Sequence, residues 1–263
     1  MAKMRLDKFI SNMTKLSRSE AVERIYHNHV RVEGKIKKDP ALKIDPEKDE
    51  VYLDNDKIEY EEFVYYVLNK PAGVVSATED KKYKTVVDLI DTEREIAPVG
   101  RLDIDTEGLM LLTDDGKLAH RLLAPKNHVD KVYYVEVEGQ ITEDAVKGFE
   151  EGVDYGEDKA SKPGKLEIIT PSSAYVTIHE GKFHQIKRMF AVYDLKVTYL
   201  KRIAMGNLTL DEALKPGEYR KICREDIIGG ATSHMSFKLF AQLVPIINSD
   251  DSWHYHITRM QCE

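Results

Sequence analysis

The sequence predicts an α+β protein in which a small N-terminal α/β module precedes a larger domain with a largely antiparallel mixed sheet. Short strand-like segments follow one another at hairpin-length spacing, with short amphipathic helices between them, which favours this fold class. The 263 residues suffice for one or two domains, and the 42% hydrophobic and 32% charged content is typical of a globular chain. No apolar run approaches the roughly 18 residues that cross a bilayer, so we expect no membrane partner.

The N-terminal module is predicted to span residues 1–58 and to place two helices before two or three strands. Apolar residues at helical spacing in 5–10 predict the first helix. Ser17 followed by Glu20 is a capping-box pattern, which predicts the start of the second helix. Two alternating segments are then typical of short strands, at 29–35 and 49–54.

Charge is unevenly distributed along the chain. The net charge of −7 argues at face value against a nucleic-acid partner. Residues 1–44, however, carry eleven Lys and Arg against five Asp and Glu, whereas residues 45–62 carry two against nine. Because local patches decide what docks on a surface, the basic segment is compatible with nucleic acid, and a solvated surface of mixed charge is the alternative.

Three motifs in this module resemble the small RNA-binding domain of ribosomal small-subunit protein four. They are Arg5-Leu6-Asp7-Lys8, Leu16-Ser17-Arg18-Ser19-Glu20-Ala21 and Val30-Arg31-Val32-Glu33-Gly34. The resemblance implies RNA binding through backbone N–H groups at helix starts and through basic side chains that neutralise phosphates. Ordinary surface charge is the alternative for the implied RNA-binding residues, which are Arg5, Lys8, Arg18, Arg24, Arg31, Lys35 and Lys37.

The larger domain is predicted to span residues 59–228 and to alternate strands with short helices. Apolar or alternating patterns predict strands at 63–68, 109–112, 132–137, 166–169, 174–178 and 196–200. Helical spacing and capping residues predict helices at 85–91, 116–124, 142–151 and 184–192. The near-continuous apolar character of 63–68 indicates a strand inside the sheet rather than at its edge.

The segment 100–116 has the residues best suited to chemistry, because three carboxylates alternate ahead of an apolar strand. A calcium loop would use Asp103 and Asp105 with Asp114 at its twelfth position. That fit is imperfect, because the twelfth position normally holds a bidentate Glu. An active-site loop is the second interpretation, with Asp103 beside Arg101 acting as nucleophile or base. A plain turn in which Asp103 caps backbone N–H groups is the third.

Five motifs in order resemble those of RNA pseudouridine synthases. The central one is Gly100-Arg101-Leu102-Asp103-x-x-Thr106-x-Gly108-Leu109-x-Leu111-Leu112-Thr113. The others are Lys70-Pro71-Ala72-Gly73, Lys131-Val132-Tyr133-Tyr134-Val135, the segment 180–190, and Leu200-Lys201-Arg202-Ile203-x-x-Gly206. The N-terminal module, and Gly100 before Arg101, resemble the RsuA-type branch of that family, which modifies small-subunit ribosomal RNA.

The resemblance implies roles for individual residues. Asp103 matches the catalytic aspartate, and Lys187 matches the basic residue that pairs with it. Tyr133 matches the tyrosine that stacks on the flipped uracil, and Leu200 the apolar residue that packs against the base. A strand tyrosine, a surface lysine and an ordinary core leucine are the respective alternatives. Three further arginines are implied to contact RNA: Arg101, Arg188 and Arg202.

The implied reaction isomerises a specific uridine to pseudouridine in small-subunit (16S) ribosomal RNA and needs no cofactor. Consistent with this, the chain contains no phosphate-cradling glycine motif. We expect no metal, since Cys223 and Cys262 lack metal-site spacing, and His179 and His184 are interpreted as scaffold or phosphate contacts. Action on large-subunit (23S) RNA is one alternative, and a non-catalytic RNA-binding module is another.

The sequence also sets expectations for partners and location. We expect a monomer that acts on ribosomal RNA within a small-subunit assembly intermediate. The N-terminus shows no apolar block behind its charges, so we expect no signal peptide and a cytoplasmic location. The tail, residues 229–263, begins with a linker-like Gly229-Gly230-Ala231-Thr232-Ser233-His234-Met235 and is interpreted as either cloning-derived or a genuine extension.

Overall fold

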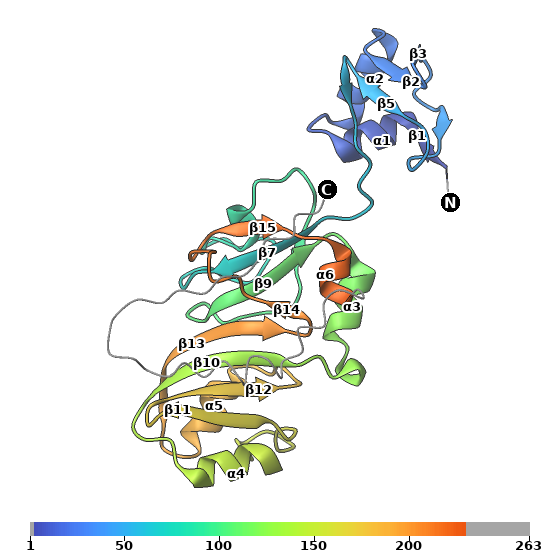
Figure 1. The fold of residues 1–263 in the computed structure, drawn as a ribbon. Coiled ribbons are helices and arrows are strands. Elements are labelled where there is room, and N and C mark those ends of the chain that lie inside the picture. Colours follow the sequence, from blue (N-terminus) through green and yellow to red (C-terminus); the bar gives the residue numbers. More distant parts are fainter. Residues whose placement is uncertain (1–2, 230–263) are drawn as a thin grey trace. The chain divides into compact units, whose positions relative to one another are not determined.

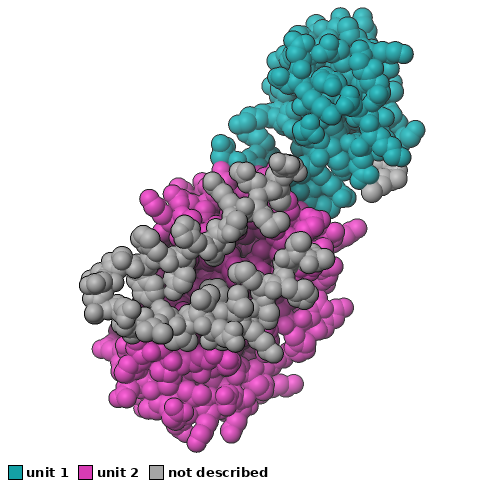
Figure 2. All heavy atoms as spheres, viewed as in Figure 1, with its two compact units in different colours: residues 1–64, 91–95 teal, residues 65–90, 96–263 magenta. Residues whose placement is uncertain are grey.

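The computed structural model describes residues 3–229, so nearly all of the tail at 229–263 lies outside the described residues. The chain divides into two compact units, coloured separately in Figure 2. Unit 1 comprises residues 1–64 with 91–95, and unit 2 comprises 65–90 with 96–263. No helix within residues 3–229 has the length and apolar character that a membrane crossing requires.

Unit 1 consists of two helices and two small sheets (Figure 1). The helices are α1 (Leu6–Met13) and α2 (Arg18–Tyr26). One sheet pairs β1 (Met4–Arg5) with β4 (Lys43–Ile44). The other has the order β3-β2-β5-β6, from β2 (Val30–Val32), β3 (Lys35–Ile36), β5 (Val51–Leu53) and β6 (Asp56–Lys57).

Local sequence signals account for these elements. The expected capping box forms, since Ser17 N donates to Glu20 Oε2 (2.7 Å) and Glu20 N donates to Ser17 Oγ (3.3 Å). The β2–β3 turn holds Glu33 and Gly34 at φ of 52° and 71°, as a tight hairpin between twisted strands requires. The helices and strands enclose one apolar core of Leu6, Phe9, Ile10, Ala21, Ile25, Val30, Val32, Ile44 and Val51.

Unit 2 is built on a nine-stranded sheet with the order β11-β12-β10-β13-β9-β7-β15, to which β14 and β8 add at β13 and β9. Among its named strands only β13 and β9 pair in parallel, which confirms the largely antiparallel mixed sheet. The strands are β7 (Tyr65–Lys70), β8 (Ala97–Pro98), β9 (Glu107–Thr113), β10 (Lys131–Glu138), β11 (Lys165–Thr170), β12 (Ser173–Ile178), β13 (Lys196–Met205), β14 (Leu208–Thr209) and β15 (Tyr219–Lys221).

Within residues 65–229, four α-helices accompany this sheet: α3 (Gly116–Leu123), α4 (Glu143–Glu151), α5 (Gln185–Ala191) and α6 (Arg224–Ile228). Helix α5 packs against β13, and α4 packs against β11 (Figure 1). The helix expected at 85–91 is instead one 3₁₀ turn, Val87–Leu89. The turn ends because Ile90 is already extended, with φ −105° and ψ 120°. The β-branched Val86 and Val87 also lower the helix propensity of this segment.

Strand register brings separated segments to one edge of the sheet. Lys70, the last residue of β7, pairs with Gly108 at the start of β9. Arg202 of β13 pairs with the same Gly108 from the other side, in parallel. Gly108 has φ of +102°, and a Cβ there would lie 2.2 Å from the Arg202 carbonyl oxygen, so only glycine permits this approach. The loop that carries Asp103 therefore leads into β9 beside the end of β7.

Candidate active site

The main chain around Asp103 is fixed by a buried lysine. Lys70 Nζ donates to the carbonyl oxygens of Thr106 (2.7 Å) and Asp103 (3.0 Å), and also to that of Pro71 (3.1 Å). The Lys70 side chain is fully buried. Ser76 adds a second clamp, because its hydroxyl donates to the Leu102 carbonyl (2.8 Å) and accepts from Leu102 N (2.9 Å). The loop that presents Asp103 is thus held through its backbone, which leaves the carboxylate available.

Burial changes the acidity of this lysine. It lowers the pKa of Lys70 to about 8, against the opposing charges of Asp105, Asp103 and Glu107. The ammonium group in this position donates to three main-chain carbonyl oxygens, and the contact with the Thr106 carbonyl is buried. Lys70 therefore stabilises the loop through main-chain contacts.

The Asp103 carboxylate faces two basic side chains. Lys187 Nζ lies 3.4 Å from Asp103 Oδ2, and His184 Nε2 lies 3.6 Å from Asp103 Oδ1. The Asp103 side chain keeps 26% exposure, so solvent and a substrate atom can reach it. The pairing of Asp103 with Lys187 expected from the resemblance is present in the structure. His184, interpreted from the sequence as a scaffold or phosphate contact, instead faces the same carboxylate.

Asp105 is a partner that sequence reasoning missed. Lys187 Nζ lies 2.6 Å from Asp105 Oδ1, closer than it lies to Asp103. Burial raises the pKa of Asp105, but the hydrogen bond from Lys187 and its charge outweigh this, and the pKa is lowered overall. The sequence signal that could have indicated this contact is the spacing of Asp103 and Asp105, which are two residues apart in one short loop. Lys187 therefore bridges two acids.

The turn before α5 is held by a buried glutamine. Gln185 Nε2 donates to Glu180 Oε1 (2.7 Å), and Gln185 Oε1 accepts from Lys182 N (3.0 Å). Gln185 is 3% exposed. His184, just before the helix, has a left-handed φ of 50°, a conformation that few non-glycine residues adopt. These contacts fix the start of α5 and so the position from which Lys187 reaches the two carboxylates.

Tyr133 and Leu200 lie on adjacent strands. In the register of β10 with β13, Tyr133 is opposite Arg202 and Leu200 is opposite Val135. Alternation along each strand therefore places Tyr133 and Leu200 on the same face of the sheet. Each is 6% exposed. This burial is also what a strand tyrosine and a core leucine would show, so their contact with a base stays a prediction.

The structure corrects the expectation that Arg202 contacts RNA. Its side chain is among the most buried in residues 3–229, at 1% exposure, and its Nε donates to the Leu109 carbonyl oxygen (2.8 Å). The physical reason is that β13 extends beyond the expected 196–200 to Met205, which places Arg202 inside the sheet. Arg202 links β13 to β9 and has no surface to offer a phosphate.

The other two arginines of unit 2 are accessible to differing degrees. Arg101 is exposed, two residues before Asp103. Arg188 is partly exposed, pairs with Glu157, and donates through Nη2 to the Tyr155 carbonyl (3.2 Å). Its guanidinium also lies 4.9 Å from the centre of the Tyr155 ring. RNA contact by Arg101 and Arg188 stays a prediction.

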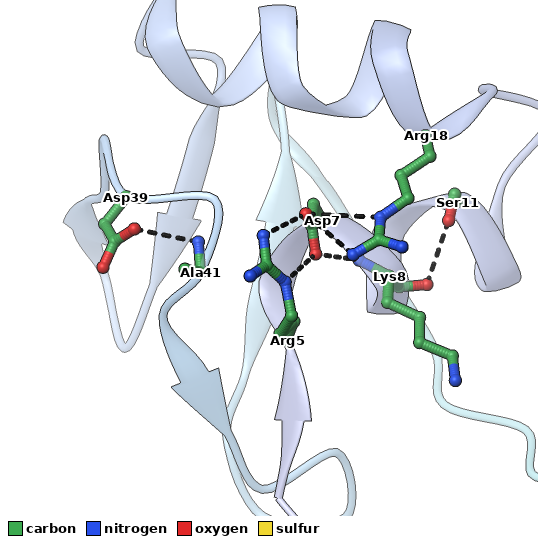
Figure 3. A network of polar contacts seen from close by, with 7 residues as sticks. All are labelled: Arg5, Asp7, Lys8, Ser11, Arg18, Asp39 and Ala41. Carbon is green, nitrogen blue, oxygen red and sulfur yellow. Dashed lines mark hydrogen bonds and ion pairs between the residues drawn. The ribbon is translucent and has the colours of Figure 1, made fainter.

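In unit 1, a buried carboxylate organises two of the expected RNA-binding arginines, as Figure 3 shows. Asp7, 2% exposed, accepts from Arg5 Nη2 (2.7 Å) and lies 3.3 Å from Arg18 Nη2. Hydrogen bonding from Arg5 is the main reason that the pKa of Asp7 falls to about 2, with burial opposing. Arg5 and Arg18 are nevertheless 40% and 57% exposed, so both keep surface for a ligand.

The remaining basic residues of unit 1 also lie at the surface. Arg24 Nη1 lies 3.5 Å from Asp54 Oδ2, and Arg31 Nη2 donates to the Asp54 carbonyl (3.2 Å). Lys8 and Lys35 are exposed, and Lys37 is half-buried. The accessibility that RNA contact needs is present at these positions, and the contact itself stays a prediction.

The geometry excludes the calcium-loop interpretation. Strand β9 runs from Glu107 to Thr113 between Asp105 and Asp114. A strand rises about 3.3 Å per residue, which separates its ends by roughly 20 Å, so Asp114 and Asp103 cannot hold one ion. Within residues 3–229 no group of three His, Cys, Asp or Glu side chains is placed to bind a metal. His179 makes a scaffold contact instead, with Nδ1 2.6 Å from Asp130 Oδ1.

Comparison with known proteins places this site in a family. The RNA pseudouridylate synthase family matches residues 64–192, and the S4 domain family matches residues 4–51. An uncharacterized RNA pseudouridine synthase of Bacillus subtilis (strain 168), YtzG, is 46% identical over 231 residues, 85% of this chain and 97% of its own length. The ribosomal small subunit pseudouridine synthase A of Escherichia coli (strain K12) is 42% identical over 227 residues, 85% of this chain and 98% of its own.

Structural comparison agrees. A crystal structure of a pseudouridylate synthase is 39% identical, covers 86% of this chain and 98% of its own, and superimposes with a TM-score of 0.61. The match spans both the S4 domain and the sheet that presents Asp103. The chain therefore belongs to the RNA pseudouridine synthase family, as an isomerase that joins an S4 domain to a pseudouridine synthase domain.

Proposed function

We propose that this protein converts one uridine of small-subunit (16S) ribosomal RNA to pseudouridine, with Asp103 as the catalytic group. The observation that carries the proposal is the partly exposed Asp103 carboxylate, 3.4 Å from Lys187, on a loop clamped by buried Lys70. Support for the substrate comes from the Escherichia coli relative named ribosomal small subunit pseudouridine synthase A, which is 42% identical and matched over 98% of its length.

The reaction requires a base to be detached and re-attached. The N1–C1′ bond of uridine breaks, the uracil rotates, and a C5–C1′ bond forms. The proton on C5 is then released to solvent, and N1 takes up a proton from solvent. Asp103 acts either by attacking as a nucleophile or by removing a ribose proton as a base. Lys187 places a positive charge 3.4 Å from the carboxylate in both cases, and the two opposite charges attract each other more strongly once RNA displaces water. Atoms and electrons balance without an oxidant or a cofactor.

The target uridine must leave its stack before Asp103 reaches it. Flipping a base costs a few kcal/mol, and stacking on an aromatic ring recovers about 1–3 kcal/mol. Tyr133 is assigned the stacking role and Leu200 the apolar wall, from adjacent strands and one face of the sheet. The residues of unit 1 that neutralise phosphates are assigned to hold the surrounding RNA.

The physiological setting follows from this substrate. We assign a small-subunit assembly intermediate as the substrate, because sequence-specific recognition of RNA targets unpaired segments. We propose a cytoplasmic monomer in which Asp103, Lys187, Tyr133 and Leu200 of unit 2 form the site. The boundary between the RNA-binding and catalytic domains is proposed near residue 58.

The test is tritium release from C5-labelled uridine in small-subunit RNA, with wild type, Asp103→Asn and the exposed control Asp158→Asn. We expect turnover by wild type and Asp158→Asn, and none by Asp103→Asn although RNA binding persists. Pseudouridine mapping in cells that lack the protein identifies the uridine. If a pseudouridine is lost only from large-subunit (23S) RNA, the substrate is large-subunit RNA and not small-subunit RNA. A wild type that binds RNA but never releases tritium would make it a binding module.

A further inference from the structure

Phe183 is the most exposed large hydrophobic side chain within residues 3–229, at 73% exposure. Single exposed apolar residues are common and need no explanation alone. Phe183 differs because of its position: it directly precedes His184, whose imidazole faces the Asp103 carboxylate at 3.6 Å. An open aromatic ring therefore lies beside the candidate active site.

The ring of Phe183 is held in a defined orientation. It stacks on the His184 ring with centroids 3.8 Å apart and an interplanar angle of 19°. His184 is itself fixed by its left-handed backbone and by Gln185, which anchors the following helix. Ordering the ring in advance reduces the entropy lost when a ligand binds its outer face.

Basic side chains flank Phe183 in the sequence. Lys182 precedes it and is exposed, and Lys187 and Arg188, which are paired with carboxylates, follow on α5. Aromatic rings interleaved with basic side chains are the arrangement that binds single-stranded nucleic acid, because each base offers a π-face and each nucleotide a phosphate. An apolar peptide would gain little from such charges. The favoured occupant is therefore a nucleobase.

We propose that Phe183, stacked on His184, is a platform for the unpaired base next to the target uridine in the substrate RNA. This inference rests on the proposed function, because the target uridine is what places the neighbouring base here. The Phe183–His184 stack holds the adjacent base while Asp103 acts on the flipped one. Phe183 is a positioning and specificity residue and takes no part in bond making.

The experiment uses the full chain and a transcript of the small-subunit RNA region that contains the mapped uridine. 2-Aminopurine replaces the base on its 5′ or 3′ side, and its fluorescence falls when it stacks on an aromatic ring. Phe183→Leu keeps an apolar side chain without a ring, and Phe183→Tyr keeps the ring. Ile169→Ala, at an exposed residue of edge strand β11, is the matched control for lost apolar surface. Thermal unfolding verifies that each variant is folded.

Wild type, Phe183→Tyr and Ile169→Ala are expected to quench one of the two probes on binding. Phe183→Leu is expected to lose that quenching and to raise the Kd for RNA about tenfold, as loss of one stacked base predicts. The KM for tritium release should rise more than kcat falls. If Phe183→Leu quenches the probe and binds RNA with the same Kd as wild type, the proposal that Phe183 stacks on the neighbouring base is wrong.

The two proposals fail in different ways. Wild type that quenches a probe but releases no tritium would refute the isomerase function and leave the stacking contact standing. Wild type that releases tritium while neither probe responds would leave the function standing and overturn the platform.

Discussion

Lys70 Nζ and the main-chain carbonyl oxygen of Asp103 lie 3.0 Å apart, although 33 positions separate them in the sequence. The same ammonium group reaches the carbonyls of Pro71 and Thr106. Lys70 is fully buried, and through these contacts it sets the conformation of the loop that presents Asp103.

Replacing Lys70 by Met should destabilise unit 2 and impair activity together. The substitution keeps the buried stem but leaves the carbonyls of Asp103 and Thr106 without a donor, which costs about 1–3 kcal/mol for each group. We expect the free energy of unfolding to fall by about 3 kcal/mol and tritium release to slow at least tenfold. Urea unfolding and single-turnover assays measure both. Exposed Lys81→Met is the control, and equal stability of the two variants would disprove the clamp.

Because Lys187 contacts both Asp103 and Asp105, we expect its replacement to reduce activity more than replacement of Asp105 does. Lys187→Met removes the cation that lies 3.4 Å from Asp103, so we expect kcat/KM to fall about a hundredfold. Asp105→Asn removes only the competing acid, 2.6 Å from the same amine, and should cost less than about tenfold. Steady-state kcat/KM values for tritium release make the comparison. Equal losses in the two variants would mean that Lys187 serves Asp105 rather than Asp103.

Arg202 should affect stability and leave the electrostatics of RNA binding unchanged. Arg202→Met breaks the buried bond to the Leu109 carbonyl, and we expect a loss of about 2–3 kcal/mol in unfolding free energy. The slope of log Kd against log salt counts neutralised phosphates, so it should match wild type. In exposed Lys35→Ala the slope should become shallower by about 0.7 with stability kept. A shallower slope in Arg202→Met would indicate that Arg202 contacts an RNA phosphate after all.

The Asp7 network predicts the acid sensitivity of unit 1. The folded pKa of Asp7 is about 2, below the usual value near 4, so its contribution is present above pH 4 and is lost as pH falls through 2. The shift corresponds to about 2 kcal/mol at neutral pH. Asp7→Asn should lose this amount at pH 7, and its difference from wild type should shrink between pH 4 and pH 2. Urea unfolding at several pH values measures the difference, and a pH-independent gap would contradict it.

Local signals in the sequence anticipated most elements of the fold. The Ser17–Glu20 capping box, the Thr142 cap of α4 and the turn at Gly34 involve residues within three positions of one another. Such contacts are encoded in neighbouring letters, as is the burial of β7 in its apolar run. Asp103 could be singled out because its loop motif is continuous, and its partner Lys187 because a second motif is equally continuous.

The tertiary structure alone decided which of these groups meet. Lys187 pairs with Asp105 across 82 positions, and Arg202 bonds to Leu109 across 93. Both contacts depend on strand register and on the start of α5, which no local pattern of charges encodes. Arg202 is an example: it lies in a motif of basic residues, yet its side chain is buried and bonds β13 to β9. The sequence determined the chemical groups and the local elements, while packing of the sheet decided which charges face a substrate and which support it.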